Sequence, residues 1–160
     1  MSRQDHHEKL ASLIDHLHVA MLTTVEDDGE LRSRPMGSQG VGDDGGLVFY
    51  THRSSPKVVE ASSHPVNISF ADPAKSTYVS ISGHARVSTD RAEIERYWKP
   101  QLKAWFDGGV DDPDIALLHV TIARAEYWDA PSGPLIAIAE FARAATGVTP
   151  VPTGDHAKIG

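Results

Sequence analysis

Two stretches of the sequence combine cationic and hydroxyl side chains in a pattern that suits a phosphate group. The first covers residues 50–57 and joins the end of a predicted strand to the start of a predicted helix. Unpaired N–H groups at a helix start, together with hydroxyls and a lysine, can surround an anion. The residues that would do so are Thr51, Ser54, Ser55 and Lys57. A serine N-cap beside a solvated lysine would look the same, so this stretch alone leaves both interpretations open.

The second stretch lies on the strand that precedes the first and reads Arg32, Ser33, Arg34, Pro35 and Met36. In a hairpin, the arginines of this strand could reach the same anion as Lys57. Two cationic segments that converge on one place are less easily explained by chance than either segment alone. The spacing therefore predicts a shared phosphate site.

The charge distribution supports this location. The chain has 22 acidic residues against 15 Lys and Arg, for a formal net charge of -7. A nucleic-acid-binding protein needs an excess of cations, so we do not expect this protein to bind nucleic acid. Within residues 31–59, however, four cations (Arg32, Arg34, Arg53, Lys57) face only two acids. This window is positive in an acidic chain, as a site for a compact anion would be.

Hydrophobic periodicity predicts the elements that hold these residues. Helical spacing marks residues 4–17, and capping residues begin short helices at 54–63 and 89–98. Strands are expected at residues 18–25, 31–36, 47–51, 66–71, 77–87 and 115–128, and a last helix at 135–145. The five glycines of residues 37–46 predict a loop. Few strands alternate with helices, so we expect a mainly β fold: a mostly antiparallel barrel of six to seven strands with flanking helices.

The remaining features predict one domain, residues 1–145, followed by a mobile tail at 146–160. Cysteine is absent, and no apolar run reaches the ~18 residues that a membrane span needs. We therefore expect a cytoplasmic protein without membrane or nucleic-acid partners. The nine histidines show no metal-binding spacing, so no metal site is predicted. The G-x-G-x-x-G run at Gly40 is better explained by a hairpin loop, because no helix follows it.

Together, these segments resemble the general stress protein 26 group of the pyridoxamine 5'-phosphate oxidase-like proteins, which bind flavin mononucleotide (FMN). The resemblance covers roughly residues 5–140 and rests on the order of several motifs rather than on one. The motifs are Arg32 to Met36, Phe49 to Thr51 with Ser54 to Lys57, Tyr78 to Ala85, Trp105 to Pro113 followed by Leu117-Leu118, and Ala125 to Asp129.

The resemblance implies an FMN-binding split β-barrel that forms a homodimer with FMN at its interface. By position, Arg32, Thr51, Ser55 and Lys57 would contact the phosphate, and Arg34 to Met36 would line the isoalloxazine ring. Tyr50 and Tyr78 would lie near the cofactor, while Trp105 and Trp128 would either cover it from the partner subunit or pack in the core or interface. The full set of expected cofactor-binding residues is Arg32, Ser33, Arg34, Pro35, Met36, Tyr50, Thr51, Ser54, Ser55, Lys57, Tyr78, Trp105 and Trp128.

One departure narrows the expected activity. Pyridoxamine phosphate oxidases follow the Glu-Tyr-Trp strand with an Arg-Leu-His run that binds substrate, whereas here Trp128 is followed by Asp129 and residues APSGP. Pro56 also stands where the family often has a basic residue. Vitamin B6 oxidation is therefore not expected. We expect a flavin-dependent oxidoreductase of unknown catalytic residues, with three alternatives: a non-enzymatic flavin-binding stress or sensor protein, or the same fold binding a deazaflavin or haem.

Overall fold

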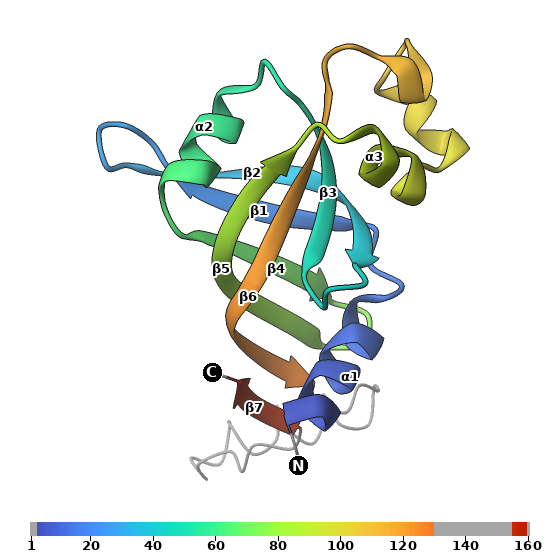
Figure 1. Ribbon diagram of the computed structural model, residues 1–160. Coiled ribbons are helices and arrows are strands. Elements are labelled where there is room, and N and C mark those ends of the chain that lie inside the picture. The colour runs from blue at the N-terminus through green and yellow to red at the C-terminus, as the bar shows by residue number, and fades with distance from the viewer. Residues whose placement is uncertain (1–2, 130–154, 160) are drawn as a thin grey trace, which may run out of the picture.

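Six antiparallel strands close on themselves into a barrel, and three α-helices lie at its ends (Figure 1). The structure is a computed structural model that describes residues 3–129 and 155–159 of the 160-residue chain. The strands are β1 (Val19–Val25), β2 (Leu31–Val41), β3 (Leu47–His52), β4 (Val66–Asp72), β5 (Thr77–Ser88), β6 (Ile115–Asp129) and β7 (Asp155–Ile159). The helices are α1 (Arg3–Ile14), α2 (Pro56–Ser63) and α3 (Arg91–Tyr97), with 3-10 turns η1 (Pro100–Ala104) and η2 (Gly109–Asp111).

The strand order is β3-β2-β1-β4-β5-β6-β7, and an additional pairing between β3 and β6 closes the barrel. The long strand β6 pairs with two strands, since residues 115–120 pair with β3 and residues 117–129 pair with β5. The β5–β6 ladder shifts register at Gly83. A Cβ atom there would lie 2.1 Å from the carbonyl oxygen of Thr121, so only glycine permits this close approach.

The ladder between β2 and β3 is short, and this creates an opening. Its register partners are Ser38 with Phe49 and Val41 with Leu47, with an irregularity between them. Beyond Ser38 the strands part: β2 continues beside β1 as far as Leu31, and β3 continues beside β6 as far as His52. Residues 31–37 and 50–52 therefore face each other across a gap with no ladder between them.

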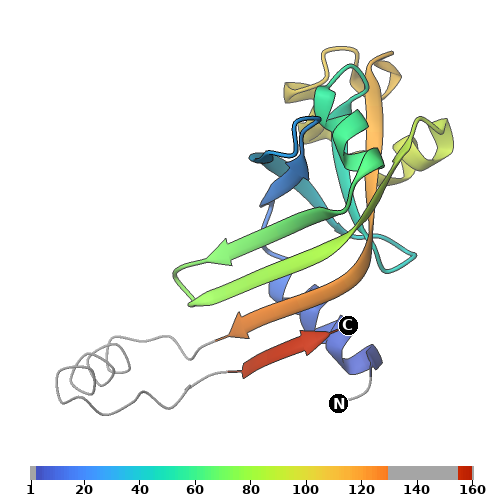
Figure 2. The ribbon, with the colours of Figure 1, turned by 90° about the vertical axis from the view of Figure 1, so that its left-hand side faces the viewer.

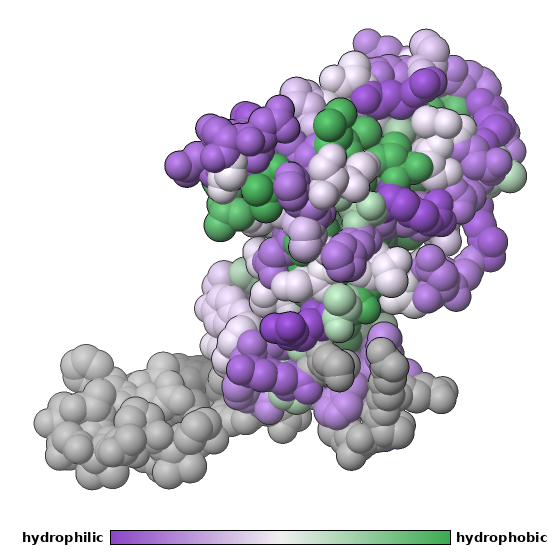
Figure 3. Space-filling view, turned by 60° about the vertical axis from the view of Figure 1, so that its left-hand side comes forward, coloured by the Kyte–Doolittle hydropathy of each residue, from purple (hydrophilic) through white to green (hydrophobic). Residues whose placement is uncertain are grey.

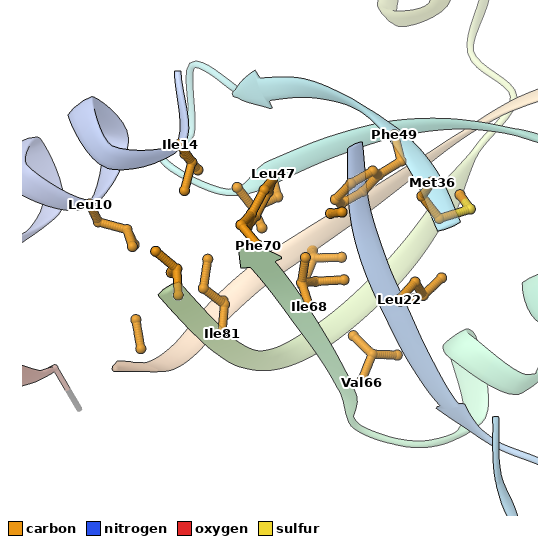
Figure 4. Close-up of a cluster of buried hydrophobic side chains, with 14 of the residues drawn as sticks. Leu10, Ile14, Leu22, Met36, Leu47, Phe49, Val66, Ile68, Phe70 and Ile81 are labelled. Carbon is orange, nitrogen blue, oxygen red and sulfur yellow. The ribbon is translucent and has the colours of Figure 1, made fainter. Parts of the chain in front are cut away.

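The barrel interior holds the larger hydrophobic core. Side chains from α1, β1, β3, β4 and β5 point toward one another in Figure 4, among them Leu22, Phe49, Ile68 and Ile81, none of which is exposed to solvent. Alternate residues of β1 and β4 are buried, as the period of two requires when one face of a strand meets the core. Leu10 and Ile14 of α1 extend this core beyond the barrel.

Three segments differ from the sequence-based expectation or lie beyond its test. Residues 37–41, expected in a loop, belong to β2, because Gly40 at φ 85° accommodates the irregular ladder. Residues 155–159, part of the expected mobile tail, form β7 beside β6. The helix expected at 135–145 and residues 146–154 lie outside the described residues.

Figure 2 shows the β4–β5 turn and the β6–β7 pair projecting from the same side of the barrel. Among the described helices, none is long and apolar enough to cross a membrane.

A salt bridge beneath α3 makes the fold sensitive to acid. Arg86 of β5 donates to Glu93 at 3.0 Å, and hydrogen bonds from Arg86 and Ser88 lower the pKa of Glu93 from 4.5 to about 2. A carboxyl group with a lowered pKa stabilises the fold above its unfolded pKa, and the contribution disappears as the pH falls from 4.5 toward 2. We expect urea unfolding to show wild type more stable than Glu93→Gln at neutral pH, with the difference shrinking below pH 4.5. A difference that does not change with pH would contradict this account.

Candidate functional site

A cavity of 680 Å³ lies where β2 and β3 part. This volume falls within the range of about 300–1,000 Å³ typical of small-molecule and cofactor sites. Its walls come from the start of β1, from β2 and β3, from the first turn of α2, and from the segment that contains η1. The lining residues are His18, Val19, Pro35, Met36, Gly37, Ser38, Gln39, Tyr50, Thr51, His52, Lys57, Lys99, Gln101, Leu102, Trp105 and Phe106.

An aromatic cluster supports one wall of the cavity. The rings of Tyr50, Trp98 and Phe106 meet edge to face at centroid distances of 5.8 to 6.4 Å. The Tyr50 hydroxyl donates to the carbonyl oxygen of Ile94 at 2.6 Å. Burial, followed by the charge of Tyr97, raises the pKa of Tyr50 far above its ordinary value. Tyr50 therefore stays protonated and serves as a rigid wall rather than as an acid or base.

The cavity is lined by positive charge. Besides Tyr50, its titratable lining residues are Lys57, Lys99, His18 and His52, and no aspartate or glutamate is among the described residues that line it. Lys57 forms no ion pair with any described side chain. Burial lowers the pKa of Lys57, and the neighbouring charge of Arg34 lowers it further. An ammonium group in these surroundings is stabilised when an anion enters the cavity.

Neither predicted arginine lines the cavity. The guanidinium of Arg34 donates from both terminal nitrogens to Glu60 Oε2 at 2.9 Å, and from Nη1 to Thr24 Oγ1 at 3.0 Å. Arg32 is exposed and lies 3.2 Å from Glu26. Of the two, only Arg34 is close enough to Lys57 to affect its pKa. Acidic partners on α2 and on the β1–β2 hairpin thus hold both guanidinium groups outside the cavity.

The predicted hydroxyl residues differ in whether they line the cavity and in what they bond. Thr51 lines the cavity, and among the described residues its hydroxyl makes one hydrogen bond, a long one of 3.5 Å to the His52 carbonyl oxygen. Ser55 is the N-cap of α2, but its side chain makes no capping hydrogen bond. Ser54 and Ser33 are engaged elsewhere, with Asp114 and Thr23 respectively. Thr51 is therefore the hydroxyl best placed beside Lys57.

β2 lines the cavity from its unpaired segment to the start of its ladder with β3. Pro35 and Met36 line the cavity as predicted, and Gly37, Ser38 and Gln39 line it as well. The Gln39 Oε1 atom is buried without a hydrogen-bond partner in the described structure. A buried acceptor without a donor is costly, so this amide is suited to a ligand that presents an N–H group.

The predicted aromatic residues lie at different ends of the molecule. Trp105 lines the cavity and is 67% exposed. Tyr78 and Trp128 are register partners in the projecting end of the β5–β6 ladder, where Trp128 stacks on His156 of β7 at 5.4 Å. Within one subunit, Tyr78 and Trp128 are not part of this cavity.

Several lining residues were not predicted. His52 lies inside the stretch 50–57, and its position beside Thr51 could have marked it as a candidate. Gln39 falls in the segment expected to be a loop, and Lys99 and Gln101 lie in an irregular segment with no periodic signal.

Figure 3 shows hydrophobic residues at the surface in the upper half of the molecule, the half that holds α2 and the β1–β2 pair in Figure 1.

Comparison with known proteins agrees with this architecture. Residues 5–150 match the family model described as pyridoxamine 5'-phosphate oxidase like. Protein bli-3 of Neurospora crassa is 33% identical over 130 residues, which cover 74% of this chain; the chain spans only 62% of that relative's length. General stress protein 26 of Bacillus subtilis is 30% identical over 126 residues, covering 75% of this chain and 86% of the relative.

A solved structure extends the comparison to the fold. The general stress FMN/FAD binding protein from Xanthomonas citri superposes with a TM-score of 0.69 at 28% identity, covering 81% of this chain and 92% of that one. The closed six-stranded barrel and the parting of β2 from β3 thus confirm the expected mainly β, split-barrel architecture. The chain belongs to the pyridoxamine 5'-phosphate oxidase-like family.

Proposed function

We propose that the protein binds FMN in the cavity between β2 and β3 and uses it as a flavin-dependent oxidoreductase. The observation that carries this proposal is Lys57, a half-buried amine without an ion-pair partner among the described residues, in a cavity whose described lining contains no acid. A phosphate-bearing ligand supplies the missing anion. The name of the Xanthomonas citri protein, which refers to FMN or FAD, supports a flavin as that ligand.

The cavity contains groups suited to the phosphate of such a cofactor and groups suited to its ring. Lys57 and Thr51 would hold the phosphate. The free edges of β2 and β3 would face the ring, and backbone N–H and C=O groups without ladder partners can bond its heteroatoms. Gln39, whose Oε1 lacks a donor, would accept from a ring N–H group. Trp105 would cover the ring on the exposed side.

When bound, the flavin would supply reversible hydride and electron transfer, which no side chain of this cavity provides. The chain's own residues would bind, orient and shield the flavin. Tyr50, Leu102 and Phe106 form an apolar wall that excludes water, and Met36 adds a further apolar side chain to the lining. Within the described chain, no substrate-binding Arg-Leu-His run follows Trp128, so the proposal does not extend to vitamin B6.

A homodimer belongs to the same proposal. Val19 and Met21 of β1 are 61% and 39% exposed on the outer face of the sheet, and Met21 pairs with Pro35, which is also exposed. Apolar residues gathered at a strand surface are typical of an interface. Since Tyr78 and Trp128 lie at the other end of the subunit, they could approach the flavin only from a second copy.

Native mass spectrometry of the purified protein mixed with FMN or riboflavin tests this function. We expect a dimer that carries one FMN per protomer and binds riboflavin at least tenfold more weakly, because the phosphate contacts are lost. Equal binding of both flavins would refute the phosphate site, and no binding of either would refute the proposal. Oxidation of reduced nicotinamide by the FMN-loaded dimer then separates an enzyme from a protein that only binds flavin.

A further inference from the structure

His52 lines the cavity but has no role among the proposed FMN contacts. It is the last residue of β3, lines the cavity, and packs its ring on Phe106 at a centroid distance of 4.7 Å. Its Nδ1 atom lies 3.3 Å from Asp114 Oδ2. The ring is thus held between an aromatic face and a carboxylate, which restricts its orientation.

Asp114 is itself firmly placed. Its carboxylate accepts from the backbone N–H of Ser54 at 2.9 Å and from the Ser54 hydroxyl at 2.7 Å. Its carbonyl oxygen accepts from the Arg53 N–H at 2.7 Å. The Ser54 hydrogen bonds, followed by the charge of His52, lower the pKa of Asp114. The carboxylate is therefore ionised at neutral pH and fixes the segment 52–54 against the start of β6.

This arrangement assigns the two ring nitrogens. A carboxylate beside Nδ1 selects the form in which Nδ1 carries the proton, leaving Nε2 available for a ligand. To donate to an anion, Nε2 must carry a proton as well, so a ring that binds an anion through Nε2–H is doubly protonated. His52 lines the same cavity as Thr51 and Lys57, and a turn closed by the Ser55 N–H and the His52 carbonyl oxygen, at 3.1 Å, joins it to the start of α2.

We propose that His52, oriented by Asp114, is a titratable ligand of the cofactor phosphate, so that FMN binding is coupled to the uptake of a proton. This inference rests on the proposed function and adds a residue and a pH dependence to it. An imidazole titrates between about pH 5 and pH 8, and a phosphate dianion at Nε2 favours its charged form. The proton comes from solvent and is released again when FMN leaves.

Other charged or titratable groups line the cavity or lie beside His52, and their contributions must be separated from that of His52. They are Lys57 on α2, Lys99 at the start of η1, His18 before β1, Asp114 before β6, and Arg53, whose guanidinium contacts the Pro113 carbonyl oxygen at 3.5 Å. Burial lowers the pKa of Lys57, so its ammonium group needs this separation most. A variant that removes only the imidazole isolates its contribution.

Isothermal titration calorimetry of FMN at about pH 7.5, in buffers of different ionisation enthalpy, measures the number of protons taken up. The FMN phosphate is largely a dianion there, since the second pKa of a phosphate monoester is about 6. We expect wild type to take up a substantial fraction of one proton per FMN. His52→Asn, which keeps an N–H near Asp114 but cannot be protonated, should lose this uptake and bind FMN about fivefold more weakly.

Two further variants complete the test. His64→Asn changes an exposed histidine outside the cavity and should behave as wild type. Asp114→Asn should reduce the uptake while circular dichroism reports a folded protein. If FMN binds but His52→Asn takes up as many protons as wild type, the inference about His52 is overturned while the proposed function stands. If FMN does not bind to wild type, the proposed function itself fails.

Discussion

Replacing Lys57 with alanine is expected to weaken FMN binding by about 10- to 100-fold. A hydrogen bond to a charged group contributes roughly 1.5–3 kcal/mol, and each 1.4 kcal/mol is a factor of ten in the dissociation constant. Lys57 lies in the first turn of α2, where alanine is well tolerated, so the fold should be retained. Quenching of flavin fluorescence during titration measures the effect.

A matched control variant tests whether the loss of any positive charge weakens FMN binding. Lys103→Ala removes the same charge from an exposed position of η1 that does not line the cavity. It should leave FMN binding within about twofold of wild type, which corresponds to a free-energy change of only ~0.4 kcal/mol. Riboflavin, which has no phosphate, should bind equally to wild type and Lys57→Ala. If the two lysine variants bind FMN alike, Lys57 is not a phosphate ligand.

Replacing Glu60 with alanine is expected to lower the free energy of unfolding by about 3 kcal/mol, because it leaves the charge of Arg34 without its partner. The side chains of Glu60 and Arg34 are only 11% and 16% exposed, and Thr24, the third member of this group, is fully buried. The hydrogen bond from Thr24, with those from Arg34, lowers the pKa of Glu60, so the carboxylate is ionised at neutral pH. Urea denaturation measures the loss.

Two comparisons make this prediction specific. Glu95→Ala removes a glutamate whose ion pair with Arg91 is about half exposed, and it should cost no more than about 1 kcal/mol. The double variant Arg34→Met with Glu60→Leu should recover most of the stability, since an apolar pair avoids the uncompensated charge. If Glu60→Ala costs no more than Glu95→Ala, then Arg34 is solvated by water and free to serve the cavity.

Local interactions produce the elements that the sequence predicts well. The alternation of buried residues in β1 and β4 follows from the period of a strand. The cap of α3 is equally local, since the Asp90 side chain accepts from the Glu93 N–H at 3.0 Å. The placement of Lys57 after a run of hydroxyl residues has the same local character. Such features could be predicted because neighbours along the chain are sufficient to produce them.

The fate of the arginines could not be predicted in this way. Arg34 lies 26 positions from Glu60, and Arg32 only six from Glu26, but the sequence does not say which acid each guanidinium meets. Arg32 was expected at the phosphate and Arg34 at the phosphate or along the isoalloxazine ring, yet both are paired outside the cavity. The pairing between β3 and β6, which closes the barrel, likewise joins segments that are far apart in the sequence.

The class of fold, the order of the strands along the chain and the cationic segment around Lys57 can be predicted from the sequence, because periodicity, capping and charge are local properties. Only the folded structure shows that β2 and β3 part to form a cavity, that Glu60 pairs with Arg34 outside it, and that Asp114 lies beside the ring of His52, which lines it. Each of these depends on which distant segments pack together, and that choice is made by the free energy of the whole fold.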